Sequence, residues 1–158
     1  MVERQADWTT ASPAGALMAL RVIWGALLFG QVALLAVVVV LRGSGAQGPG
    51  ESVTALFWLD VAFLGVAIAV GSFVRGQIYK RHWVGDVIMP RGYVLGNVVL
   101  LALLEAASIF GLLVTLLHGR LMPTVIPTFI AMGLQAINFP TGAPMRPSRS
   151  AWRPRAET

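Results

Sequence analysis

The feature that most constrains this chain is a series of apolar stretches that are almost free of charged residues. They cover residues 17–41, 53–74, 92–117 and 121–139. A helix that crosses a bilayer needs about 20 predominantly apolar residues. In the whole chain 56% of residues are hydrophobic and 12% are charged, whereas a soluble domain carries about 25% charged residues. We therefore expect an all-α integral membrane protein, a four-helix bundle built from two transmembrane hairpins.

The first and fourth stretches each raise an alternative. The first could belong to a secretory signal peptide, with Ser44 and Ala46 at a cleavage site. It is too long for the apolar region of a signal, so an uncleaved first helix is the better interpretation. The fourth is short and contains Pro127, yet Pro123 suits the first turn of a helix and Pro140 suits its end.

Lysine and arginine are distributed unequally between the connections. One side of the membrane would hold Arg4, Arg21, Arg75, Lys80, Arg81, Arg91, Arg146, Arg149, Arg153 and Arg155. The other side would hold only Arg42 and Arg120. Basic residues are retained on the cytoplasmic side, so we expect a protein of the inner (cytoplasmic) cell membrane with both termini in the cytoplasm. That orientation requires an even number of spans, which favours the fourth.

The predicted domain organisation places a cytoplasmic segment at 1–16, the transmembrane domain at 17–140 and a disordered basic tail at 141–158. The net charge of +5 indicates anionic inner-leaflet lipid, and not nucleic acid, as the partner of the basic residues. The predicted contacts with lipid headgroups are Arg75, Lys80, Arg81, Arg91, Arg146, Arg149, Arg153 and Arg155.

Four polar side chains are predicted to lie near the middle of the membrane. Glu105 falls near the centre of the third stretch, and Ser108 follows it by one turn. Asp60 lies about 5 Å farther outward in the second stretch, and Gln31 lies at nearly the same level in the first. Unpaired polar groups are costly in hydrocarbon. We therefore expect these side chains to face the bundle interior and to satisfy one another, with at least one carboxyl protonated.

Two interpretations of this polar set stay open. In one, Glu105 and Asp60, assisted by Gln31 and Ser108, bind and release a proton or cation. In the other, the acids are protonated packing residues that fix the register of the helices. An acid inside a membrane favours a functional role, but the sequence offers no basic partner at that depth and no further acids for a relay.

Small residues spaced four apart indicate that the helices pack closely. The pairs are Gly92 with Gly96, Ala107 with Gly111, Ala26 with Gly30, and Gly65 with Ala69.

The sequence also argues against catalysis and against the binding of a metal or cofactor. There are no cysteines, which excludes disulfides and thiolate metal sites. His82 and His118 are predicted to lie at opposite membrane faces, so they could not ligate one haem or metal ion together. No nucleophile paired with a base and no phosphate-binding loop can be identified. We therefore expect no enzyme, no metal and no cofactor.

Residues 101–117, LALLEAASIFGLLVTLL, resemble the ion-carrying helix of the proteolipid (c) subunits of rotary ATPases. In that family a mid-membrane acid is followed by an alanine, an aromatic residue and a glycine. The resemblance implies that Glu105 is the proton or sodium carboxylate, with Phe110 where the family often has tyrosine and Gly111 at its glycine. The whole chain resembles small, mostly uncharacterised four-span membrane proteins of bacteria, which implies a fold and a compartment but no activity.

Two functional hypotheses follow. The leading one is a small non-catalytic membrane protein, either an accessory subunit of a larger membrane complex or a self-associating homo-oligomer, with a buried cluster of protonated carboxyls. The alternative is translocation of protons or cations through Glu105 in a proteolipid-like oligomer.

Overall fold

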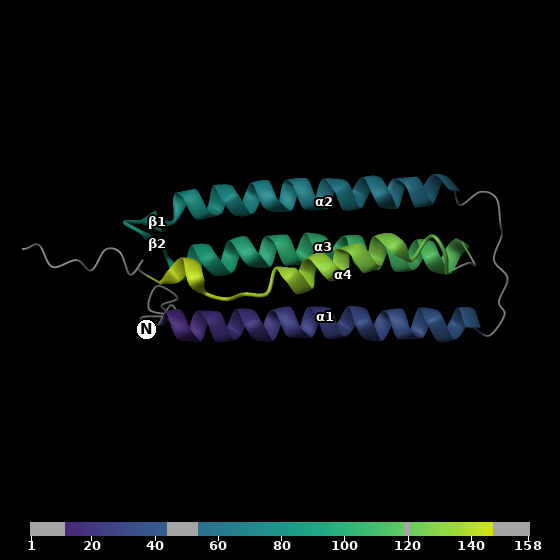
Figure 1. Cartoon of the computed structure of the whole chain (residues 1–158), viewed down its shortest axis with the longest axis horizontal. Coiled ribbons are helices and arrows are strands. Elements are labelled where there is room, and N and C mark those ends of the chain that lie inside the picture. Colours follow the sequence, from purple (N-terminus) through teal and green to yellow (C-terminus); the bar gives the residue numbers. More distant parts are fainter. Residues whose placement is uncertain (1–11, 44–53, 119–120, 147–158) are drawn as a thin grey trace, which may run out of the picture.

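The computed structural model describes residues 12–43, 54–118 and 121–146 (Figure 1). Its helices are α1 (Pro13–Gly43), α2 (Thr54–Arg81), α3 (Pro90–His118) and α4 (Ile126–Ile137), followed by a short 3₁₀ helix at Ala143–Met145. Strands β1 (Trp83–Val84) and β2 (Val87–Ile88) form a small antiparallel hairpin between α2 and α3. In the described part of the chain, the expected all-helical architecture is thus confirmed, apart from this hairpin.

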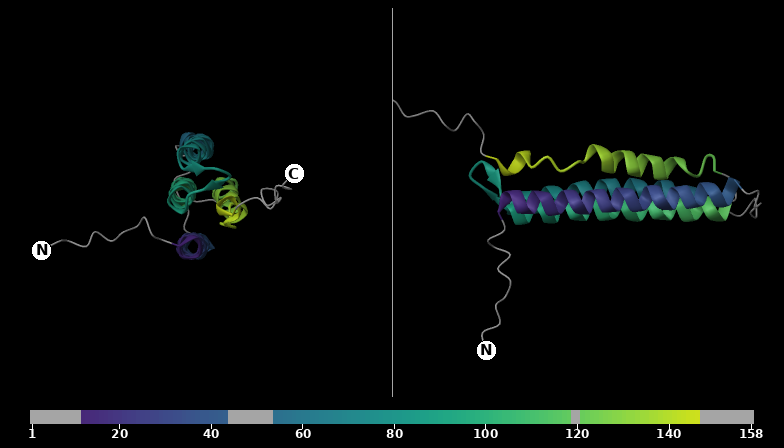
Figure 2. Two further views of the ribbon diagram at one scale, coloured as in Figure 1. Left: turned by 90° about the vertical axis from the view of Figure 1, so that its left-hand side faces the viewer. Right: turned by 90° about the horizontal axis from the view of Figure 1, so that it is seen from below.

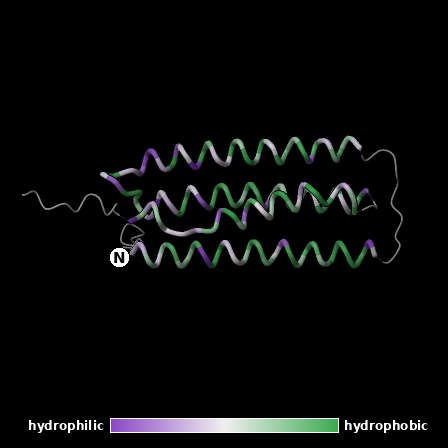
Figure 3. The backbone as a smooth tube through the Cα atoms, viewed as in Figure 1, coloured by the Kyte–Doolittle hydropathy of each residue, from purple (hydrophilic) through white to green (hydrophobic). Residues whose placement is uncertain are grey.

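Helices α1, α2 and α3 are long and apolar enough to cross a membrane. They have 31, 28 and 29 residues, and a helix of that length extends over about 42 to 46 Å. This exceeds the hydrocarbon thickness of about 30 Å. Each contains most or all of one predicted span and continues beyond it. Figure 3 shows the hydrophobic residues spread along these helices, with polar residues more frequent near their ends.

The fourth predicted span differs from the expectation. Only its middle part is helical, because α4 has 12 residues, from Ile126 to Ile137. Turns precede it around Pro123, and after Asn138 the chain is non-helical up to the 3₁₀ helix. A helix of this length covers about 18 Å, so it cannot cross the membrane alone. Proline explains both limits: Pro127 is compatible with the first turn of a helix, and Pro140 cannot continue one.

Helix α3 is the centre of the bundle and contacts each of the other three helices. Seen end on, α3 and α4 lie in the middle, with α2 and α1 on opposite sides of them (Figure 2). The start of α1, the β-hairpin and the 3₁₀ helix all lie at one end, which we call the hairpin end (Figure 1).

Two apolar clusters form the core. One lies toward the hairpin end and contains Leu20, Ile88, Tyr93 and Leu101. The other contains Leu64, Ala67, Ala107 and Ala131, where α2, α3 and α4 meet. Large side chains such as Phe29 and Phe73 are exposed on the outside, as expected for a surface that faces lipid.

Close helix packing is confirmed at some of the predicted small residues and not at others. A Cβ on Gly92 would overlap the side chain of His82, which directly follows α2, and one on Gly96 would lie 2.7 Å from Cε1 of Tyr79 on α2. In contrast, a Cβ on Gly65 or Gly30 would have no neighbour within 4 Å. The Gly92 and Gly96 pair therefore sets the α2–α3 distance, whereas Gly65 and Gly30 do not contribute to an interface within the chain.

The first residues of the predicted tail pack against the bundle. Residues 141–146 are ordered, and Met145 packs against the cluster that contains Leu20. Gly142 has a φ of 74°, and a Cβ there would lie 2.8 Å from Cδ2 of Leu17, so both the backbone and the space favour glycine. The rest of the predicted tail and most of the segment 1–16 lie outside the described residues.

We expect Gly96→Ala to destabilise the bundle by about 1 to 3 kcal/mol, because the new methyl group overpacks the α2–α3 interface. The ring of Tyr79 cannot move away freely, since its hydroxyl accepts a hydrogen bond from Asn97 and the ring stacks on Tyr93. Unfolding in mixed micelles, followed by tryptophan fluorescence, would measure the change. Gly65→Ala is the matched control and should be neutral or slightly stabilising; equal costs at both positions would contradict this account of the interface.

Candidate functional site

Three of the four polar residues predicted at membrane depth are buried between the helices. The exposed fractions are 1% for Gln31, 0% for Asp60 and 0% for Ser108. Glu105 is only half-buried. The structure therefore separates the predicted set into interior residues and one residue at the edge of the bundle.

Asp60, Ser108 and Thr128 surround one glycine of α3. A Cβ on Gly111 would lie 2.5 Å from Oγ1 of Thr128 and 3.0 Å from Oδ2 of Asp60. The Thr128 hydroxyl donates a hydrogen bond of 3.3 Å to the carbonyl oxygen of Ser108. Side chains from α2 and α4 thus converge on the position of the missing side chain of Gly111, next to the backbone carbonyl of Ser108. We call these four residues the Gly111 cluster.

Several buried polar atoms in this region have no hydrogen-bond partner among the described residues. They include both carboxyl oxygens of Asp60 and the hydroxyl of Ser108. The expectation that the polar side chains would satisfy one another is therefore wrong for these two residues. Elsewhere in the interior such bonds are made: Thr115 donates to the carbonyl of Gly111, and Asn97 donates to the carbonyl of Tyr93.

Gln31 is paired with a residue that sequence analysis missed. Its Nε2 donates a hydrogen bond of 2.6 Å to Oε1 of Gln135 on α4, and Gln135 is fully buried. The remaining Oε1 of Gln31 and Nε2 of Gln135 have no partner among the described residues. The sequence pattern that could have identified Gln135 is its spacing from Thr128. The two residues are seven positions apart and therefore lie on one face of α4.

Glu105 is not part of the interior cluster, contrary to expectation. It follows Leu101 by about one turn on the side of α3 that packs toward Leu20 of α1. Ala102, Ala106 and Ile109 beside it are exposed. The structure shows no hydrogen bond or ion pair between Glu105 and any described residue. Side chains three residues apart on a helix are rotated by about 300°, which is about 60° short of a full turn. This angle between Glu105 and Ser108 is enough to place Glu105 at the edge of the bundle and Ser108 inside it.

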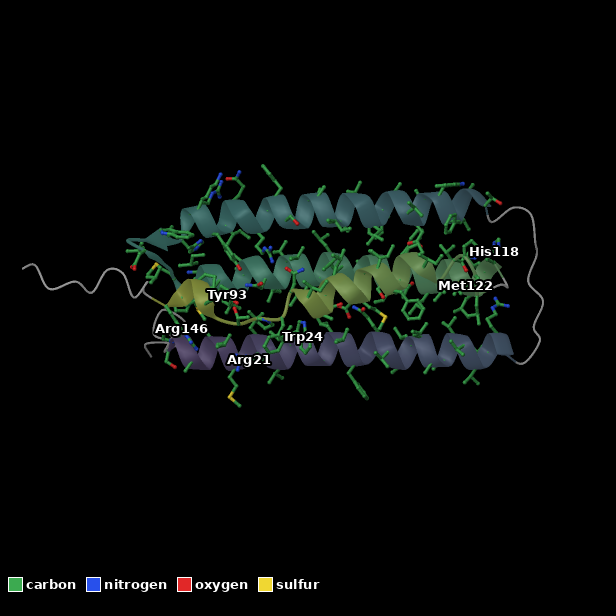
Figure 4. The ribbon with its side chains drawn as sticks, viewed as in Figure 1. Arg21, Trp24, Tyr93, His118, Met122 and Arg146 are labelled. Atoms are coloured by element: carbon green, nitrogen blue, oxygen red, sulfur yellow. The ribbon has the colours of Figure 1, made fainter. Side chains whose placement is uncertain are left out.

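The last turn of α4 and the non-helical chain after it are held by side chains of the long helices. Trp24 Nε1 donates a hydrogen bond of 2.8 Å to the carbonyl of Gln135, and Arg21 Nε donates one of 3.2 Å to the carbonyl of Pro140. The hydroxyl of Tyr93 accepts a bond of 3.1 Å from the Gly142 N–H. Figure 4 shows Trp24 and Tyr93 beside this stretch. Backbone polar groups outside regular helices need such partners in a membrane.

The basic residues divide into two groups. Arg75 is half-buried, and its Nη1 donates a hydrogen bond of 2.8 Å to Oδ1 of Asn138, so this predicted lipid contact has a partner within the chain. The exposed basic residues at the hairpin end are Lys80, Arg81, Arg91 and Arg146. Arg149, Arg153 and Arg155 lie outside the described residues.

The histidines do not come together. Nδ1 of His82 lies 2.9 Å from the carbonyl of Ile78, and His118 lies at the far end of α3 (Figure 4). Within the described ranges, no group of three or more histidine, cysteine or acidic residues could hold a metal ion.

A scan against protein-family models finds no match, and searches of curated proteins and of solved structures find none either.

We expect Gln31→Leu to cost about 1 to 2 kcal/mol of stability, because it removes the partner of the buried Gln135 side chain. The double variant Gln31→Leu/Gln135→Leu should recover most of this loss, since no buried amide is then left unpaired. A double-mutant cycle measured by unfolding in mixed micelles would test the coupling. Strictly additive costs would show that the two amides do not interact.

Proposed function

We propose that the chain is a four-pass protein of a bacterial inner membrane with both termini in the cytoplasm. In this proposal, α4 and the non-helical chain after it together make the fourth crossing. The fourth segment supports this, because it runs along the bundle and ends at the hairpin end, where α1 begins (Figure 2). Trp24, Arg21 and Tyr93 satisfy polar backbone groups of that segment, as a crossing by non-helical chain requires.

Reporter fusions would test this topology. A fluorescent protein fused after residue 158 should fold in the cytoplasm, whereas alkaline phosphatase at the same position should be inactive. Alkaline phosphatase inserted near residue 48, between α1 and α2, should be active. Activity of phosphatase at the C-terminus would show an odd number of crossings and contradict the proposal.

We further propose that the protein is not an enzyme and that it works by associating with other helices in the bilayer. The observation that carries this proposal is the position of Glu105. It lies next to the midpoint of α3, it is half-buried, and no described residue bonds to it. A polar group at that depth is stabilised by a partner on another helix.

A second copy of the chain fits this position. A protonated carboxyl both donates and accepts hydrogen bonds, so two Glu105 side chains can pair across an interface. Exposed Ala102 and Ala106 beside Glu105 would let the backbones approach, as small residues do between membrane helices. A different subunit of a larger complex could supply the partner in place of the second copy.

A second candidate function is the translocation of protons or cations through Glu105 in a proteolipid-like oligomer. The half-exposed position of Glu105 near mid-membrane favours it, because an acid that exchanges ions at a subunit interface must be reachable from outside its own bundle. This candidate also agrees with the resemblance of residues 101–117 to the proteolipid helix.

We expect Glu105→Leu to weaken self-association at least about tenfold, or about 1.4 kcal/mol, because it removes the polar contact. Glu105→Gln should fold and associate, since an amide also donates and accepts, whereas Glu105→Lys should fail to assemble. Energy transfer between labelled copies in liposomes, measured at several protein-to-lipid ratios, reports the association. Phe73→Leu, on the exposed surface of α2, is the control.

Normal association of Glu105→Leu would refute the assembly role. A hydrophobic carbodiimide then distinguishes the two functions in the same samples. Modification of Glu105 that is blocked by sodium or by high pH would favour ion translocation, and an unreactive carboxyl would favour the purely structural contact.

A further inference from the structure

We propose that the Gly111 cluster binds one small monovalent cation, such as Na⁺, inside the bundle. The ligands would be the carboxylate of Asp60 and the hydroxyls of Ser108 and Thr128. This site is separate from Glu105, so it does not depend on the proposed assembly.

The geometry brings candidate ligands together. Oγ1 of Thr128 and Oδ2 of Asp60 lie 2.5 and 3.0 Å from the position of a Cβ on Gly111. A side chain at this position would overlap the Thr128 oxygen and press tightly against the Asp60 oxygen. The glycine therefore lets these oxygens from α2 and α4 approach the same point on α3, and Ser108 lies one turn away on α3.

The second observation that supports the cation site is that polar atoms of Asp60 and Ser108 are unpaired. Asp60 and Ser108 are fully buried, and neither the two carboxyl oxygens nor the Ser108 hydroxyl has a hydrogen-bond partner among the described residues. A buried carboxylate without a partner costs several kcal/mol. Thr115 and Asn97 in the same interior do form hydrogen bonds, and the buried amides of Gln31 and Gln135 bond to each other, whereas the side chains of Asp60 and Ser108 have no partner among the described residues.

Among the described residues of α2, α3 and α4, no basic side chain lies near Asp60 to supply the missing charge. Arg75 is the nearest basic residue to Asp60 on α2, fifteen positions away, or about 22 Å along the helix. On α3, His118 lies seven positions beyond Gly111, about 10 Å along the axis, and α4 has no basic residue. Thr128 is in the first turn of α4, where the helix dipole contributes about half a positive charge. This partial charge is too small to neutralise a carboxylate.

The chemistry of the cluster selects the ion. All the candidate ligands are oxygens, which suit hard cations. A single carboxylate is neutralised by one monovalent ion, whereas a divalent ion would leave a net positive charge in a low-dielectric interior, which is costly. The tight space at Gly111 favours a small ion.

Thermal unfolding of the full-length protein in lipid nanodiscs at pH 8 would test the site. NaCl should raise the Tm in a saturable manner relative to choline chloride at equal ionic strength, because an ion that binds only the folded state stabilises it. Asp60→Asn keeps the shape of the side chain and should lower sodium affinity at least tenfold. Thr128→Val should also weaken it.

Two variants control for general damage. Thr115→Val removes a buried hydroxyl that bonds only within α3, and it should keep the sodium response. Glu105→Leu should keep it too, although its self-association is weakened. If Asp60→Asn does not fold, isothermal titration of the wild-type protein with NaCl decides, with one ion bound per chain as the expected result.

Equal Tm values in sodium and choline would overturn the proposal. So would a sodium response that persists in Asp60→Asn, or no detectable binding of sodium to the wild-type protein. A Tm that changes with pH but not with sodium would show that Asp60 holds a proton instead, and this result would also reject the cation site.

Discussion

In a bilayer, polar backbone groups must find partners within the protein, and the fourth segment of this chain has to meet that constraint without a full-length helix. Trp24 bonds to a carbonyl in the last turn of α4, and Arg21 and Tyr93 bond to a carbonyl and an amide of the chain after it. These three residues come from α1 and α3, so the same contacts that satisfy the segment also tie the bundle together. They add to the packing of α1 against α3, to which Leu20 contributes.

The two acids inside the apolar helices occupy different environments. Asp60 is enclosed where α2, α3 and α4 meet, with Gly111 and Thr128 as neighbours. Glu105 lies at the edge of α3, next to exposed alanines. A buried acid needs a counter-charge, a proton or an ion within its own chain, whereas an acid at the edge can be satisfied by another chain. The carboxyl of Asp60 therefore suits a role inside the bundle, whereas that of Glu105 suits a contact between molecules.

Sequence analysis predicted the fold better than the site. The length of the apolar stretches was enough to place α1, α2 and α3, because crossing a bilayer fixes the length of a helix. The fourth segment was harder, since its hydropathy does not show that the chain leaves the helix at Asn138. Glu105 was misplaced because hydropathy does not tell which sides of α3 are covered by neighbours. Gln135 was missed because a single amide in a short stretch shows no pattern until its partner Gln31 is known.

The contacts of α1 also affect the order in which the protein can assemble. Gln31 bonds to a residue 104 positions later, Trp24 to one 111 positions later and Arg21 to one 119 positions later. These polar groups of α1 thus obtain their partners only after α4 and the chain beyond it have been synthesised. During insertion, α2 and α3 can pair as soon as their hairpin forms, and α1 can pack against α3. The hydrogen bonds of α1, however, form only when the fourth segment joins the bundle.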